Sequence, residues 1–115
     1  MRHKSYVLGI FGEYCAMLWY LLGFYGILEH RFKTKVGEID LICKRFSTIV
    51  FVEVKARSGC YDDVLCAKHQ QKRIIRAAEW FLFENPKYAG YNLRFDLILI
   101  QPYNWPKRFK NFVEL

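Results

Sequence analysis

The chain has 115 residues, a formal net charge of +7, and a hydrophobic share of 53%. This length fits one domain spanning residues 1–115, and the apolar share excludes a disordered chain. The positive charge favours a polyanionic partner such as a nucleic acid, but an anionic membrane would be attracted equally, so charge alone selects neither.

A long apolar run, Tyr6 to Leu28, follows the basic N-terminus. It is long enough to span a membrane, but Glu13 would then lie inside the bilayer, glycines interrupt the run, and no cleavage site of small residues follows. We therefore predict no membrane association. The run should instead form an amphipathic helix from Leu8 to Leu22, ended by Gly23, and then a strand from Tyr25 to Phe32.

Residues 37–57, GEIDLICKRFSTIVFVEVKAR, carry charges inside two runs that are otherwise typical of buried strands. A hairpin that turns at Phe46–Ser47 would place Asp40 opposite Glu53. Lys55 would project from the same face as Glu53, because side chains alternate along a strand. Carboxylates in such a setting need a cation, hydrogen bonds or a metal to compensate their burial.

Paired carboxylates suit Mg²⁺ or Mn²⁺, which bind one or two of them and keep several waters. Asp40 and Glu53 are therefore the predicted metal ligands, and the metal would turn a bound water into a nucleophile. Lys55 would orient that water or stabilise the charge that builds on a phosphate. The alternative is a structural cluster of ion pairs at a sheet edge, since such networks can mimic sites.

The four cysteines do not indicate a disulfide framework, because the core is large enough to do without one. We predict reduced thiols and a cytoplasmic protein. A zinc site formed by Cys60, Cys66 and His69 is disfavoured, because the gap between these thiols is longer than in structural zinc sites.

Residues Asp62 to Glu84 have the periodicity of one helix. Lys68, Lys72 and Arg76 recur every fourth residue along one of its faces. Together with Arg57, this basic row is the predicted contact surface for nucleic acid. The alternative is a solvated helix face, because charged rows on exposed helices are common.

Asn85–Pro86 should end this helix, and Leu93 to Ile100 should form a further strand. Asp96 lies inside that strand, and we interpret it as structural. The tail from Tyr103 to Leu115 interleaves aromatic and basic residues, which would either stack on bases or close the core.

Several motifs together resemble a known family. They are Gly12-Glu13, GEIDLI at 37–42, VFVEVKAR at 50–57 and RFD at 94–96. This combination resembles the bacterial YraN-type family, uncharacterised protein family 0102, of the PD-(D/E)XK nuclease superfamily. That family is similar to archaeal Holliday junction resolvases. The resemblance extends from Gly9 to the last predicted strand.

The resemblance implies an α/β fold with a restriction-endonuclease-like core, in which helices flank a central mixed β-sheet in the order helix, three strands, helix, strand. It makes Asp40 and Glu53 metal ligands, Lys55 the catalytic lysine, and Glu13 the helical acid that completes the site. The alternative for Glu13 is a solvent-facing position. Gln70 departs from the family pattern, in which we expect a lysine at this place.

The function implied is that of a Mg²⁺- or Mn²⁺-dependent endonuclease that hydrolyses phosphodiester bonds in DNA, either branched or duplex. A homodimer would suit an enzyme that cuts symmetric strands. The alternative function is a non-catalytic nucleic-acid-binding module of the same fold.

Overall fold

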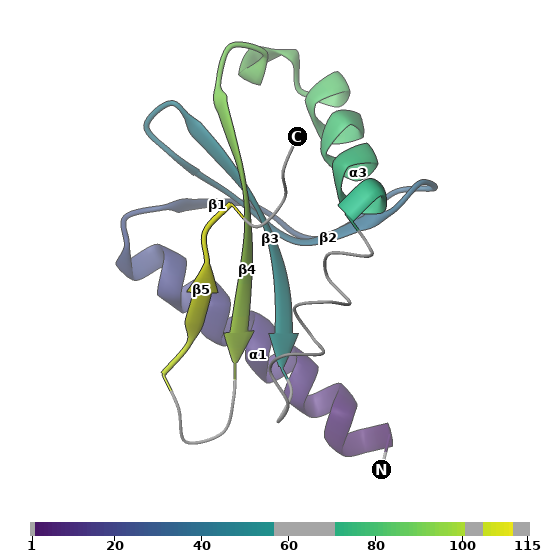
Figure 1. The fold of residues 1–115 in the computed structure, drawn as a ribbon, viewed down its shortest axis with the longest axis vertical. Helices are drawn as coiled ribbons and strands as arrows, with labels where there is room; N and C mark the ends of the chain where they lie inside the picture. The colour runs from purple at the N-terminus through teal and green to yellow at the C-terminus, as the bar shows by residue number, and fades with distance from the viewer. Residues whose placement is uncertain (1, 57–70, 101–104, 112–115) are drawn as a thin grey trace.

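The computed structural model describes residues 2–56, 71–100 and 105–111, in which helices flank a five-stranded mixed sheet (Figure 1). The elements are α1 (Arg2–Leu22), β1 (Gly26–Lys33), β2 (Glu38–Arg45), β3 (Thr48–Ala56), α3 (Gln71–Glu84), the 3₁₀ turn η1 (Pro86–Tyr88), β4 (Asn92–Ile100) and β5 (Lys107–Phe109). The strands lie in the order β1-β2-β3-β4-β5, with β3 and β4 parallel and the other neighbours antiparallel. The predicted α/β class is confirmed, and the layout fits a restriction-endonuclease-like core.

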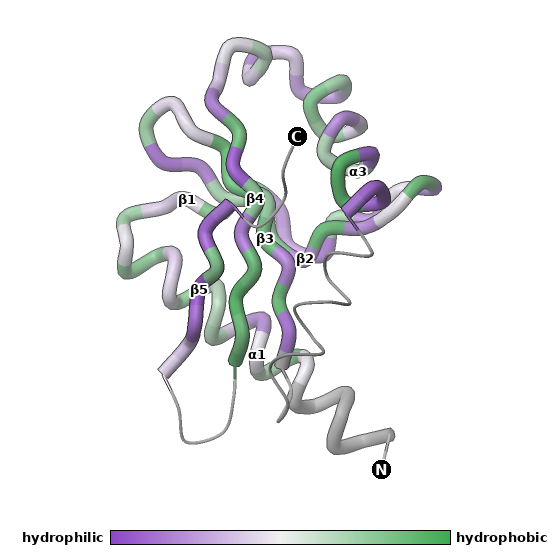
Figure 2. The backbone as a smooth tube through the Cα atoms, viewed as in Figure 1, coloured by the Kyte–Doolittle hydropathy of each residue, from purple (hydrophilic) through white to green (hydrophobic). Residues whose placement is uncertain are grey.

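The sheet separates two hydrophobic cores. Val50 and Val52 of β3 pack on the side of α1, whereas Phe51 packs on the side of α3. Because side chains alternate along a strand, Glu53 and Lys55 lie on the α3 side. Figure 2 shows this alternation as hydrophilic and hydrophobic steps at the end of β3, beside the continuously hydrophobic end of β4.

The first helix begins at Arg2 rather than at Leu8 and ends at Leu22 as predicted. At its end the Tyr25 N–H donates to the Tyr20 carbonyl at 3.0 Å, and the left-handed residue is Phe24, with φ 67°. Gly23 therefore caps the helix without taking the left-handed conformation that glycine favours at such ends.

The helix α1 is not amphipathic in the predicted sense, because its outer face also carries large apolar side chains. The exposed ones are Phe11, Tyr14, Leu18, Leu21 and Leu22. None of the helices in the described part of the chain is long and apolar enough to cross a membrane.

The second predicted helix is confirmed over Gln71–Glu84 and ends before Asn85, as predicted. Its remaining predicted part, residues 62–70, lies outside the described residues. The chain then returns in β4, which runs parallel to β3 from Thr48↔Asn92 to Ala56↔Ile100. The segment that contains α3 is therefore the crossover that a parallel strand pair requires.

The sheet has one strand that was not predicted. Residues 107–109 form β5 and pair antiparallel with β4, where Leu97 lies opposite Phe109. Trp105, just before this strand, is 86% exposed, so it does not close the core. Phe112 lies outside the described residues.

Asp96 is completely buried in β4, and its carboxylate is fully compensated by hydrogen bonds. Oδ2 accepts from the Tyr20 hydroxyl at 2.9 Å and from the Arg94 guanidinium at 2.9 Å. Oδ1 accepts from the Asn111 N–H at 3.0 Å. These contacts join α1, β4 and the segment after β5, which supports the structural interpretation of Asp96.

Gly37 seats the first turn of α3 against the start of β2. A Cβ atom built on this buried glycine would collide with the backbone carbonyl of Arg73. The backbones meet this closely only because glycine has no side chain. The position of α3, and with it the direction of the Arg73 side chain, depends on this contact.

We predict that Gly37→Ala destabilises the protein by about 1–3 kcal/mol, because α3 must shift away from β2. Gly9→Ala is the matched control, since a Cβ atom at Gly9 in α1 meets nothing within 4 Å. The control should gain about 0.5–1 kcal/mol from the lower entropy of its unfolded chain. Urea denaturation measures both, and equal stabilities of the two variants would contradict the proposed contact.

Candidate functional site

The predicted hairpin register is confirmed. The pairs run from Arg45↔Thr48 to Leu41↔Val52, with the turn at Phe46–Ser47 and φ 53° at Phe46. The ladder stops one position before Asp40 and Glu53. At that point the Val54 N–H donates to Asp40 Oδ2 at 2.8 Å, so the carboxylate takes the place of a backbone acceptor.

β2 is irregular at Asp40. Ile39 belongs to the core under α3 and Leu41 to the core under α1, although a regular strand would direct both to one face. In the facing strand β1, Arg31 has a left-handed backbone with φ 58°. The pairs His30↔Leu41 and Phe32↔Ile39 flank this position, where regular pairing is interrupted. Irregularities in a strand change the direction of its side chains. Here the Asp40 side chain is directed toward β3, where it accepts the hydrogen bond from Val54.

Glu53 and Lys55 form an ion pair within β3, as their shared face requires. Lys55 Nζ lies 3.3 Å from Glu53 Oε1, and both side chains are only 13% exposed. Their neighbours in the parallel strand β4 are the buried Leu97 and Leu99. The pair is therefore bordered by apolar side chains on the side of β4, where burying a charge is costly.

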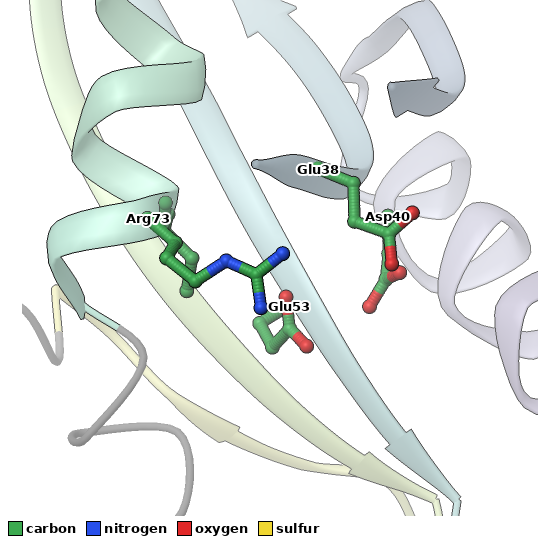
Figure 3. Close-up of a pocket in the computed structure, with 5 residues that line it drawn as sticks. Glu38, Asp40, Glu53 and Arg73 are labelled. Atoms are coloured by element: carbon green, nitrogen blue, oxygen red, sulfur yellow. The ribbon is translucent and has the colours of Figure 1, made fainter. Parts of the chain in front are cut away.

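A small cavity of about 90 Å³ joins these acids to α3. Its lining residues are Glu38, Asp40, Glu53, Arg73 and Ile74. Figure 3 shows the Arg73 guanidinium pointing from the first turn of α3 toward Glu53, with Asp40 and Glu38 across the cavity. Sequence reasoning missed Glu38 and Arg73 as lining residues.

The cavity carries an excess of negative charge. Burial, and then the charge of Asp40, raise the pKa of Glu53 to about 8, although Lys55 opposes the shift. Burial also raises the pKa of Asp40 to about 6; the Val54 hydrogen bond opposes this, while the charge of Glu13 adds to it. One ammonium does not compensate two buried carboxylates.

Glu13 reaches the site from the side of α1. Its Oε1 accepts from Arg31 Nε at 2.9 Å and lies 2.7 Å from His30 Nε2. The side chain is 16% exposed, so the alternative of a solvent-facing position is wrong. Glu13 lines a second cavity, of about 210 Å³, that also includes Glu38 and Asp40. Asp40 therefore lines both cavities.

The residues present fit a hard divalent cation at Asp40 and Glu53. Both are oxygen donors, and a bound cation would stabilise the ionised carboxylates, which burial, the main cause of their raised pKa values, disfavours. Across residues 2–56, 71–100 and 105–111, no three His, Cys, Asp or Glu side chains converge closely enough to hold a metal. A metal at these two acids would accordingly keep several waters, which is the usual coordination of Mg²⁺.

The predicted nucleic-acid contacts are described only in part. Lys72 and Arg76 are exposed on α3, whereas Arg57, Lys68 and Gln70 lie outside the described residues. The disfavoured zinc ligands Cys60, Cys66 and His69 lie outside them too. Cys15 and Cys43 are free thiols, as predicted.

Comparison with known sequences identifies clear relatives. The model of the uncharacterised protein family UPF0102 matches residues 12–100, which include Glu13, Asp40, Glu53 and Lys55. A UPF0102 protein of Bartonella tribocorum is 42% identical over 112 residues, covering 96% of this chain and 86% of the relative. A UPF0102 protein of Chelativorans sp. is 40% identical, covering 96% and 90%, and one of Rhodopseudomonas palustris is 44% identical, covering 92% and 82%. These names state no activity.

The raised pKa of Glu53 predicts how stability depends on pH. Its pKa is about 8 in the folded protein against an ordinary 4.5, so the folded state binds a proton more tightly than the unfolded state. The stability that this proton provides is complete below pH 4.5 and is lost as the pH rises through 8. In EDTA, Glu53→Gln should therefore lose less stability than the wild type between pH 5 and pH 8, by more than about 1.4 kcal/mol, the equivalent of one pKa unit.

Urea denaturation at several pH values measures this difference. Asp40→Asn keeps an acceptor for the Val54 N–H and should act in the same direction over a lower window, because the pKa of Asp40 rises only to about 6. If the free energies of unfolding of the wild type and of Glu53→Gln change equally with pH, the pKa of Glu53 is not raised in the folded protein.

Proposed function

The chain belongs to the uncharacterised protein family UPF0102, and we propose that it is a metal-dependent nuclease that hydrolyses phosphodiester bonds in DNA. One observation carries the proposal. Asp40 and Glu53 share a small cavity in which burial raises the pKa of both carboxylates, and among the described residues only Lys55 forms an ion pair with one of them. Paired carboxylates poised in this way favour binding of Mg²⁺ or Mn²⁺.

Each residue would have a distinct role. Asp40 and Glu53 would hold the metal ion, which when bound supplies an activated water and neutralises charge on the scissile phosphate. The Val54 N–H fixes the orientation of Asp40. Lys55 has donors beyond the one directed to Glu53, and these would hold the attacking water or a phosphate oxygen. Glu13 would act through its negative field at Asp40.

An anionic substrate is supported by the charges around the acids. Two carboxylates alone would repel a phosphodiester, so cations must flank them for such a substrate to approach. Arg73 points into the cavity, and Lys72 and Arg76 are exposed on the same helix (Figure 3). The net charge of +7 adds a long-range attraction for DNA.

The second candidate is a nucleic-acid-binding module without catalysis. It is favoured by the pairing of Glu13 with Arg31 and His30, which occupies the third acid with cationic or hydrogen-bonding partners of its own. In that case the buried acids would have no catalytic role, and the basic surface alone would bind the nucleic acid.

Cleavage assays separate the two. The purified protein should cleave labelled duplex, single-stranded or four-way-junction DNA with Mg²⁺ or Mn²⁺ and not with EDTA. Glu53→Gln, Asp40→Asn and Lys55→Ala should each lower the rate by about 100-fold or more, the usual cost of losing one such group. Glu84→Gln, an exposed acid at the end of α3, is the matched control and should cleave normally. Residual activity equal in all four variants would point to a contaminating nuclease.

Metal binding gives a readout that does not depend on cleavage. Mg²⁺ should raise the melting temperature of the wild type more at pH 8 than at pH 6, because protons compete with the metal for Asp40 and Glu53. Glu53→Gln should remove this effect. A folded protein that binds DNA, shows no shift with Mg²⁺ and cleaves nothing would be the non-catalytic module.

A further inference from the structure

Two large aromatic side chains are exposed on the outer face of α3. Phe83 is 85% exposed and Trp80 is 43% exposed. The core under this helix is already filled from its other face, by Ile74, Ala77, Ala78 and Phe81. Packing among the described residues therefore gives no reason for the two aromatic side chains to be on the outside.

The exposed aromatics continue the basic row. Lys72, Arg76 and Trp80 are four residues apart and Phe83 follows three residues later, so all four share one side of the helix. Lys72 and Arg76 are exposed as well. From Lys72 to Phe83 the helix rises about 16 Å, which is about five steps of a nucleic acid strand.

The cationic end of this row lies next to the candidate site. Arg73 follows Lys72 directly and points into the cavity with Glu53 and Asp40 (Figure 3). The aromatic end lies toward η1, where Lys87 lies 5.2 Å from the ring centre of Tyr88. Positive charge therefore lies at both ends of the helix, and the aromatics lie between.

We propose that the outer face of α3, formed by Lys72, Arg76, Trp80 and Phe83, binds an unpaired nucleic acid strand beside the candidate site. Phosphates would contact Lys72 and Arg76, and bases would stack on Trp80 and Phe83. A duplex hides its base faces, so only unpaired bases can use the aromatics, whereas either form can use the cations. This inference rests on the proposed function, because the strand bound here would be the one presented to the cavity.

The face carries two exposed cations, Lys72 and Arg76, against one acid, and this excess of positive charge favours a polyanionic partner. Glu79 is the acid on it among the described residues of α3, and it lies three residues after Arg76 and four before Phe83. Its carboxylate opposes a phosphate backbone. Removing it should therefore tighten binding of a nucleic acid, and would not do so for a basic or purely apolar protein partner.

The test is fluorescence anisotropy of labelled single-stranded and duplex oligonucleotides in EDTA, across salt concentrations. Trp80→Ala and Phe83→Ala should each weaken single-strand binding by about 5- to 150-fold, leaving duplex binding and the salt dependence unchanged. Lys72→Ala and Arg76→Ala should weaken both forms and reduce the salt slope by about one each. Glu79→Gln should tighten both. Phe11→Ala, an exposed aromatic of α1, should change nothing.

The outcomes separate this inference from the nuclease proposal. Aromatic-dependent binding of single strands without cleavage in Mg²⁺ would keep the inference and remove the nuclease. Cleavage with a folded Trp80→Ala, Phe83→Ala double variant that still binds single strands normally would keep the nuclease and overturn the inference. Equal losses on single strands and duplex in that variant, or no single-strand binding by the wild type, would overturn it as well.

Discussion

The burial of two carboxylates beside one ammonium, that of Lys55 among the described residues, is the constraint on which the site depends. Asp40 and Glu53 lie where β2 and β3 end their pairing, in a cavity closed by the first turn of α3. An apolar pair at these positions would make the fold more stable, because the desolvation cost of charges is seldom recovered. Buried charges without full compensation, which make a fold less stable, occur mainly at functional sites. The raised pKa values of both acids are the measurable form of that cost.

A second buried acid shows how different a structural carboxylate is. Asp96 lies in the same sheet but on the face toward α1, and it accepts hydrogen bonds from Tyr20, Arg94 and the Asn111 backbone. Arg94 belongs to the same strand, but Tyr20 and Asn111 lie in other segments, so this acid ties the fold together. Glu53 is paired with Lys55 alone among the described ion pairs, and that partner belongs to its own strand. The number of hydrogen-bond partners, rather than burial, therefore distinguishes the acid that holds the fold together from the acid that we propose for catalysis.

The sequence predicted the part of the site that local geometry determines. A two-residue turn at Phe46–Ser47 fixes the hairpin register, and alternation along β3 puts Glu53 and Lys55 on one face. Arg73 could not be predicted, because its place depends on the close approach of α3 to Gly37, which only the packed structure contains. The partners of Glu13 depend on a left-handed backbone at Arg31, a conformation that residue type does not indicate. The three-residue strand β5 forms by tertiary pairing with β4, and its sequence carries no strand signal.

One rigid helix links the cavity to the exposed basic and aromatic face. Burial of Ile74, Ala77, Ala78 and Phe81 fixes the rotation of α3 about its axis, and Gly37 fixes the position of its first turn. Lys72 and Arg73 are adjacent and both exposed, but Arg73 also lines the cavity. A phosphate bound at Lys72 would accordingly lie one residue from the side chain that enters the cavity. A helical turn is rigid, so the distance between Lys72 and Arg73 is fixed. Binding of a strand at Lys72 would therefore also place a phosphate of that strand near Asp40 and Glu53.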